Sequence, residues 1–89
     1  MEDHPGIMFR DGPAGRRAGL IGGPDVWEVV VVLADYSAAD ASTAVARTAR
    51  SLRLSNAQVR TAEWYYAAYP DEIDRRIIEN EEAAQDARA

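Results

Sequence analysis

The chain has 89 residues, no cysteine and a formal net charge of −5, which predicts one small domain without disulfides or thiolate metal sites. A domain of this size has a thin core, so association with a second copy or another protein is an expected source of stability. The acidic N-terminus does not resemble a secretion signal, and the longest apolar run, Val29 to Ala34, is too short for a membrane span; we therefore expect a cytoplasmic protein.

After a flexible N-terminus at residues 1–5, residues 6–23 predict a β-hairpin. Two short apolar pieces, residues 7–9 and 18–21, flank the turn sequence 11–15, which we interpret as a loose loop. No Gly-Lys-Ser/Thr follows the glycines, so a nucleotide phosphate loop is not expected. The adjacent Arg16 and Arg17 either bind phosphate or serve as exposed solubilising charges.

Residues 24–36 have features of both a strand and a helix. Their five valines favour a strand, whereas Pro24, Asp25 and Glu28 suit the start of a helix capped by Gly23. Apolar residues recur at helical spacing, and we predict a helix that is apolar nearly all round. Such a helix is buried on most sides, in part against a second copy or another protein.

The sequence Ser37 to Asp40 resembles a capping box, which predicts the next helix from about Asp40 to Arg53. One stripe of this helix is expected to pack inward, and it consists of Ala41, Val45, Thr48 and Leu52. Arginines follow every third residue on another face, at Arg47, Arg50 and Arg53. Residues 37–70 are basic, with four arginines against two carboxylates.

A second capping box, Ser55 to Gln58, predicts a third helix with Val59, Ala62, Tyr66 and Tyr69 on one stripe. Only about three residues, 53–55, separate it from the preceding helix, which indicates a helix-turn-helix core over residues 24–69. The candidate DNA-binding residues are Arg47, Arg50, Arg53, Ser55, Asn56, Gln58 and Arg60. The arginines of the first helix would contact phosphates, and the third helix would read base edges.

Residues 70–89 predict an additional, acidic helix that starts at Pro70. Its isoleucines, Ile73, Ile77 and Ile78, either close the core or form a docking stripe for another chain. No large apolar residue follows Asn80, so residues 81–89 are expected to be frayed or stabilised by a partner. The acidic character indicates a solvated helix or a surface for a basic partner.

The runs HPGIMFRDGPAGRRAGLIGGPDVWEVV (residues 4–30) and AEWYYAAYPDEIDRRI (residues 62–77) resemble the family called domain of unknown function 433. The most specific part of the resemblance is residues 65–74. The likeness covers about residues 4–80 and implies a homeodomain-like three-helix fold with an N-terminal hairpin. It also implies an antitoxin paired with a PIN-like ribonuclease toxin. The chain departs from the family in its longer middle helix and in its tail beyond Asn80.

In that setting residues 70–89 would bind the toxin. The candidate partner-binding residues are Ile73, Arg75, Arg76, Ile77 and Ile78. The isoleucines would fill an apolar groove, and an arginine would pair with the carboxylates that hold the nuclease's magnesium.

We do not expect an enzyme, a cofactor or a metal site. The only histidine, His4, has no partner for catalysis, and the carboxylates of residues 71–82 spread around a helix. The leading interpretation is therefore an antitoxin that binds a toxin and operator DNA as a homodimer or larger assembly. The alternatives are a stand-alone helix-turn-helix regulator and a protein-assembly module that does not contact DNA.

Overall fold

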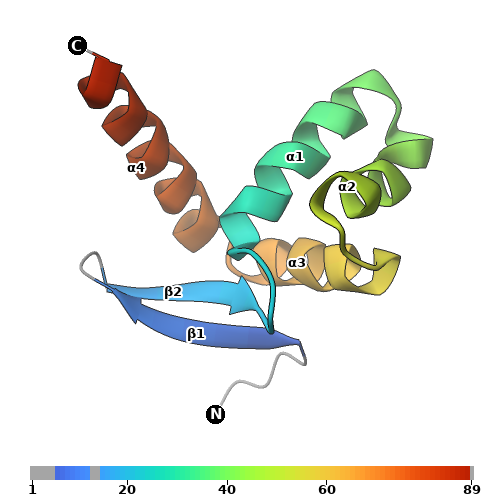
Figure 1. Cartoon of the computed structure of the whole chain (residues 1–89), viewed down its shortest axis with the longest axis horizontal. Coiled ribbons are helices and arrows are strands. Elements are labelled where there is room, and N and C mark those ends of the chain that lie inside the picture. Colours follow the sequence, from blue (N-terminus) through green and yellow to red (C-terminus); the bar gives the residue numbers. More distant parts are fainter. Residues whose placement is uncertain (1–5, 13–14, 89) are drawn as a thin grey trace.

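The computed structural model describes residues 6–12 and 15–88 and consists of a small hairpin followed by four α-helices (Figure 1). The elements are β1 (Ile7–Gly12), β2 (Gly15–Leu20), α1 (Val26–Ala39), α2 (Ala44–Leu52), α3 (Asn56–Ala68) and α4 (Pro70–Arg88). A short 3₁₀ turn, η1 (Ala41–Thr43), precedes α2. The prediction of a mainly helical chain with an N-terminal hairpin and an additional C-terminal helix is confirmed.

The hairpin is antiparallel and tighter than predicted. Ile7 pairs with Leu20 at one end and Gly12 with Gly15 at the other, and Asp11 pairs with Arg16. Strand pairing therefore continues into residues 11–15, which the sequence had indicated to be a loose loop. Residues 13–14 and the predicted flexible segment 1–5 lie outside the described residues.

Helix α1 forms as predicted, but its ends differ from the expected ones. Asp25 is the N-cap residue, not Gly23, and its backbone N–H donates a hydrogen bond of 3.1 Å to the Glu28 carboxylate. At the other end the helix runs through Ser37 to Ala39, because Ala38 and Ala39 favour continuation of the helix. The capping box predicted at Ser37–Asp40 therefore does not form.

Asp40 instead caps η1, where its carboxylate accepts hydrogen bonds from the Ser42 backbone N–H at 3.0 Å and from the Ser42 hydroxyl at 2.7 Å. These hydrogen bonds, with a weaker contribution from the charge of Arg47, hold the pKa of Asp40 below its usual value. As a result α2 has nine residues and is shorter than the helix predicted from about Asp40 to Arg53.

The buried face of α2 also differs from the predicted stripe. Thr48 is buried as expected, with Val45 and Leu52 half-buried beside it, but Ala41 is exposed in η1. The other buried positions of α2 are Ala44 and Ala49.

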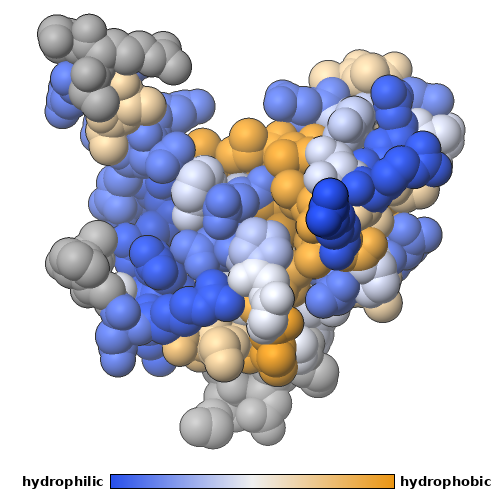
Figure 2. All heavy atoms as spheres, in the orientation of Figure 1, coloured by the Kyte–Doolittle hydropathy of each residue, from blue (hydrophilic) through white to orange (hydrophobic). Residues whose placement is uncertain are grey.

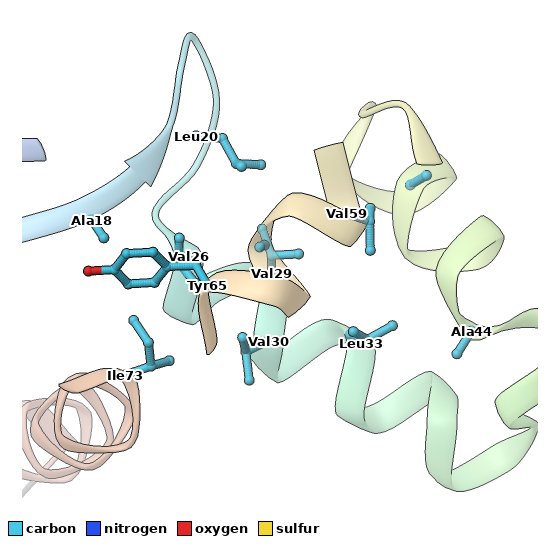
Figure 3. Close-up of a cluster of buried hydrophobic side chains, with 12 residues drawn as sticks. Ala18, Leu20, Val26, Val29, Val30, Leu33, Ala44, Val59, Tyr65 and Ile73 are labelled. Carbon is cyan, nitrogen blue, oxygen red and sulfur yellow. The ribbon is translucent and has the colours of Figure 1, made fainter. Parts of the chain in front are cut away.

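The core lies where β2, α1, α2, α3 and the first turns of α4 meet (Figure 3). Its largest side chain is Tyr65 of α3, which is 2% exposed and which the predicted stripe of Tyr66 and Tyr69 had omitted. The Tyr65 ring lies edge-on to Phe9 of β1, with centroids 6.2 Å apart, and 4.8 Å from the ring of Tyr69. Tyr65 thus joins the hairpin to α3 and α4.

Among the residues that the structure describes, helix α4 contacts the rest of the protein along its first turns. Ile73 is 1% exposed and belongs to the core, whereas every side chain described from Ile78 to Asp86 is exposed. The helix continues to Arg88 and diverges from α1, so that the two helices form a V (Figure 1). The fraying predicted for residues 81–89 is therefore not seen over residues 81–88.

Candidate DNA- and partner-binding surfaces

Helices α2 and α3 meet in the short turn that the sequence predicts. The turn consists of residues 53–55, and the backbone N–H of Leu54 donates a hydrogen bond of 2.8 Å to the carbonyl oxygen of Ala49. Arg53 ends α2 in the left-handed conformation, with φ of 58°, a position that glycine usually occupies because it has no Cβ. The long charged side chain of Arg53 is exposed there.

The capping box at the start of α3 forms as predicted. The Ser55 N–H donates to Gln58 Oε1 at 2.8 Å, and the Gln58 N–H donates to Ser55 Oγ at 3.1 Å. These bonds fix the direction in which α3 leaves the turn. They also engage Ser55 Oγ and Gln58 Oε1 within the helix cap. These two side chains are therefore less available for contacts with bases than the sequence predicted.

The outward face of α3 carries three exposed side chains at intervals of four residues. Asn56 and Arg60 were predicted from the sequence, and Trp64, which is 51% exposed, was not. The spacing of Trp64 from Arg60 could have placed it on this face. An aromatic side chain here adds a flat apolar surface next to the polar pair.

The arginine row of α2 lies on the outer surface beside the C-terminal part of α1. Arg47 stacks over the ring of Tyr36, with its guanidinium carbon 4.8 Å from the ring centroid. An open hollow of about 260 Å³ lies next to this pair, lined by Tyr36, Arg47, Arg50 and Ser51. Its guanidinium and hydroxyl groups are hydrogen-bond donors suited to a phosphate oxygen.

Within residues 6–12 and 15–88, the arginines of α2, its C-cap Arg53, and Arg60 form no ion pair. We call Arg47, Arg50, Arg53 and Arg60 the corner arginines. Because no carboxylate of the described residues forms an ion pair with them, and the charge of Arg47 acts only weakly on Asp40, their charge remains available to an anionic ligand.

The arginines of the hairpin have a different environment. Asp25 is 8% exposed, and its carboxylate lies 2.9 Å from Arg10 Nη1 and 3.4 Å from Arg17 Nε. Arg10 also donates to the carbonyl oxygens of Leu20 and Gly23, at 3.2 and 2.9 Å. Arg17 is thus half-buried and paired with Asp25. It is therefore neither a free phosphate-binding group nor an exposed solubilising charge, the two alternatives that the sequence left open.

Arg16 is exposed, but its guanidinium group packs over the hairpin. Its guanidinium carbon lies 4.1 Å from the centroid of the Phe9 ring, and its backbone carbonyl accepts a hydrogen bond of 2.7 Å from Arg76. A phosphate grip formed by Arg16 and Arg17 together is therefore not supported by this geometry.

The residues predicted to bind a partner through α4 divide into two groups. Ile73 is in the core, and Arg76 is held by the Arg16 carbonyl and by Glu79, 3.5 Å away, with 18% of its side chain exposed. These two residues attach α4 to the body of the protein and are not open docking residues. Arg75 and Ile78 are exposed and Ile77 is half-buried. The surface that a partner could contact is therefore smaller than the five-residue surface predicted from the sequence.

The described residues contain no group of three or more histidine, cysteine, aspartate or glutamate side chains that could hold a metal ion. None of the helices described is both long and apolar enough to cross a membrane.

Comparisons with protein-family models, with curated proteins and with solved structures found no match for this chain. The resemblance to the family called domain of unknown function 433 therefore stays a prediction that rests on the residues quoted for it.

Proposed function

We propose that this protein is a DNA-binding antitoxin, in which the α2–α3 corner binds operator DNA and α4 binds a ribonuclease partner. The observation that carries the DNA half is the set of corner arginines, which are exposed and form no ion pair with any carboxylate that the structure describes. Arg53 is the most informative of them, because a non-glycine residue in the left-handed conformation is disfavoured. A strained position that keeps a charged side chain suggests that the charge is used.

In this proposal the corner acts as a helix-turn-helix within a homeodomain-like arrangement of α1, α2 and α3. The start of α3 enters the major groove, where Asn56 and Arg60 face base edges. Arg47 and Arg50 contact backbone phosphates, together with Arg53. The corner contributes only four arginines to a chain with a net charge of −5, so useful affinity requires a dimer or larger assembly.

The toxin half of the proposal comes from the family resemblance. Helix α4 supports it in two respects: it diverges from the body of the protein, and it carries seven carboxylates against three arginines. Such a helix suits the basic RNA-binding face of a PIN-like ribonuclease, with Ile77 and Ile78 as apolar contacts. Arg75 is the exposed arginine nearest to them.

The DNA half is tested with a labelled duplex of the sequence immediately upstream of the gene, titrated by fluorescence anisotropy at several salt concentrations. Arg50→Ala should weaken binding and lower the log–log salt slope by about one, because one phosphate contact is lost. Arg75→Ala is the matched control, since it removes the same charge from an exposed position on α4. Binding that does not respond to salt, or equal binding by both variants, contradicts the DNA role.

The toxin half is tested by copurification of the native two-gene product. Arg75→Glu combined with Ile78→Glu should release the nuclease, because both positions are exposed and would then carry carboxylates into the interface. These substitutions should leave DNA binding unchanged. A nuclease that still copurifies with the double variant excludes this part of α4 as its binding site.

A further inference from the structure

The outer face of α1 carries an apolar stripe that the described rest of the protein covers only in part, since Trp27 also packs against the core. Trp27, Val31, Ala34 and Ala38 follow one another at intervals of four, three and four residues, which places them on one helical face. The first two side chains are half-buried and the last two are exposed. In Figure 2, hydrophobic surface gathers over α1, in the space between α4 and α2.

Next to this stripe lies a hollow of about 210 Å³ between α1 and α3, with Ala34 common to both. It is lined by Val30, Leu33, Ala34, Ser37, Glu63 and Tyr66. The Tyr66 hydroxyl donates a hydrogen bond of 2.7 Å to the Asp74 carboxylate, which links this wall to α4. The stripe and the hollow form one apolar floor, which we call the α1 face.

Both edges of the α1 face carry carboxylates. Glu28 and Asp35 lie seven residues apart on α1, both exposed, on the side of the stripe away from the hollow. Glu63 and Asp74 lie on the opposite side. No basic residue occurs between Gly23 and Ala46, so nothing on α1 neutralises these edges.

We infer that the α1 face binds an amphipathic helix of a partner protein that carries lysine or arginine on both sides of its apolar stripe. The floor provides the apolar contact, and the acidic edges select a basic helix over an acidic one. A second copy of this chain fits less well, because its α1 and α4 would both bring carboxylates to edges that are already acidic. The inference goes beyond the proposed function, since it concerns neither the corner nor the outer end of α4.

The test uses the full-length protein and a synthetic helical peptide of about 18 residues, long enough to form a helix, made of leucine and lysine in an amphipathic pattern. A second peptide replaces each lysine by glutamate. Calorimetric titration should detect the lysine peptide and not the glutamate peptide.

Ala34→Glu is the decisive variant, because it places a carboxylate on the floor while increasing the overall attraction for a basic peptide. We expect binding to weaken by at least about tenfold, since the new carboxylate would be desolvated beneath the peptide. Ala84→Glu, an identical substitution at an exposed position of α4, should leave binding unchanged. Thermal unfolding followed by circular dichroism checks that both variants fold.

Equal binding by the two peptides, undiminished binding to Ala34→Glu, or no binding of the lysine peptide overturns the inference. Sedimentation gives an independent reading of the same face. A wild-type dimer that Ala34→Glu converts to a monomer would assign the face to a second copy and likewise overturn the inference. We expect Ala34→Glu to bind the operator duplex with unchanged affinity per protomer. A failure of the α1-face inference is therefore distinguishable from a failure of the proposed DNA binding.

Discussion

The arginines of the hairpin and the corner arginines differ in what surrounds them. Arg10 and Arg17 share the buried carboxylate of Asp25 and so hold the hairpin to the start of α1. Arg16 stacks on Phe9 within the hairpin. Among the described residues no carboxylate pairs with a corner arginine. The same residue type thus stabilises the fold in one region and leaves a charged surface in the other.

The contrast explains why the count of positive charges alone could not locate a DNA-binding surface. The hairpin holds three arginines within eight residues, nearly as dense a group as Arg47, Arg50 and Arg53, yet two of the three are paired with Asp25. The difference can be tested by removing the Asp25 charge beside the hairpin and the Arg53 charge at the corner. Titration of Tyr65, which joins the hairpin to α3, gives a third test.

The largest effect is expected from Asp25→Asn. Asparagine caps a helix as well as aspartate does, so the substitution removes the charge and leaves the cap. Arg10 and Arg17 would then be partly buried without a counter-charge, and we expect the free energy of unfolding to fall by about 2 kcal/mol. This is below the effect for a fully buried pair because 31% and 40% of the arginine side chains remain exposed.

Urea unfolding measures this change, and Asp35→Asn at an exposed position of α1 is the control, with a change below about 0.5 kcal/mol. If the two variants lose the same stability, the ion pairs do not hold the hairpin to α1.

Local chemistry made much of the fold predictable from the sequence. The capping box at Ser55 and Gln58 and the short turn before it depend on residues close in the chain, and both form as predicted. Helix α1 was predicted correctly because the residues at its start outweighed the preference of its valines for strands. The same local reasoning failed at Ser37, where two alanines continue the helix beyond the candidate cap.

Contacts between distant residues were not predictable in the same way. The Arg10–Asp25 pair joins residues 15 apart, and the Arg76–Arg16 hydrogen bond joins residues 60 apart. Nothing in the spacing of Ile73 distinguishes a core residue from a docking residue, since both uses require an apolar face. The packing of α4 against α1 and α3 places Ile73 in the core, and that packing depends on the whole fold.

An intermediate effect is expected from raising the pH. Burial of Tyr65, and then its hydrogen bonds of 3.0 and 3.1 Å to the Glu72 carboxylate, raise the pKa of this phenol above its ordinary value near 10. The folded protein therefore favours the neutral hydroxyl. The stabilisation is present below about pH 10 and is lost as the pH rises above it, by up to about 1.4 kcal/mol per pH unit.

Urea unfolding between about pH 8 and 11 measures this decline, and Tyr65→Phe is the comparison because it keeps the ring and removes the titrating group. The variant should be less stable at the lower pH by about 1 kcal/mol, for loss of the hydrogen bonds, and should decline less steeply above pH 10. Parallel pH profiles of unfolding free energy for the two proteins would show that ionisation of Tyr65 does not cause the loss of stability. Tyr66, whose pKa is raised by its hydrogen bond to Asp74, remains in both proteins.

The smallest change in stability, and the most informative about function, is expected from Arg53→Gly. With φ at 58°, Arg53 is in a conformation that glycine adopts without steric strain, so the variant should gain about 0.5–1 kcal/mol in unfolding free energy. If the corner binds DNA, the same variant should bind the operator duplex more weakly and show a salt slope lower by about one.

Arg53→Lys separates the two effects, because it keeps the charge and the strain and should retain both the original stability and most of the affinity. A glycine variant that is more stable and binds DNA as tightly as the wild type would mean that the charge at this turn has no role in binding. Opposite changes in stability and affinity would instead show that the corner keeps an arginine in a strained position for its contact with DNA, in contrast to the hairpin, where the arginines stabilise the fold.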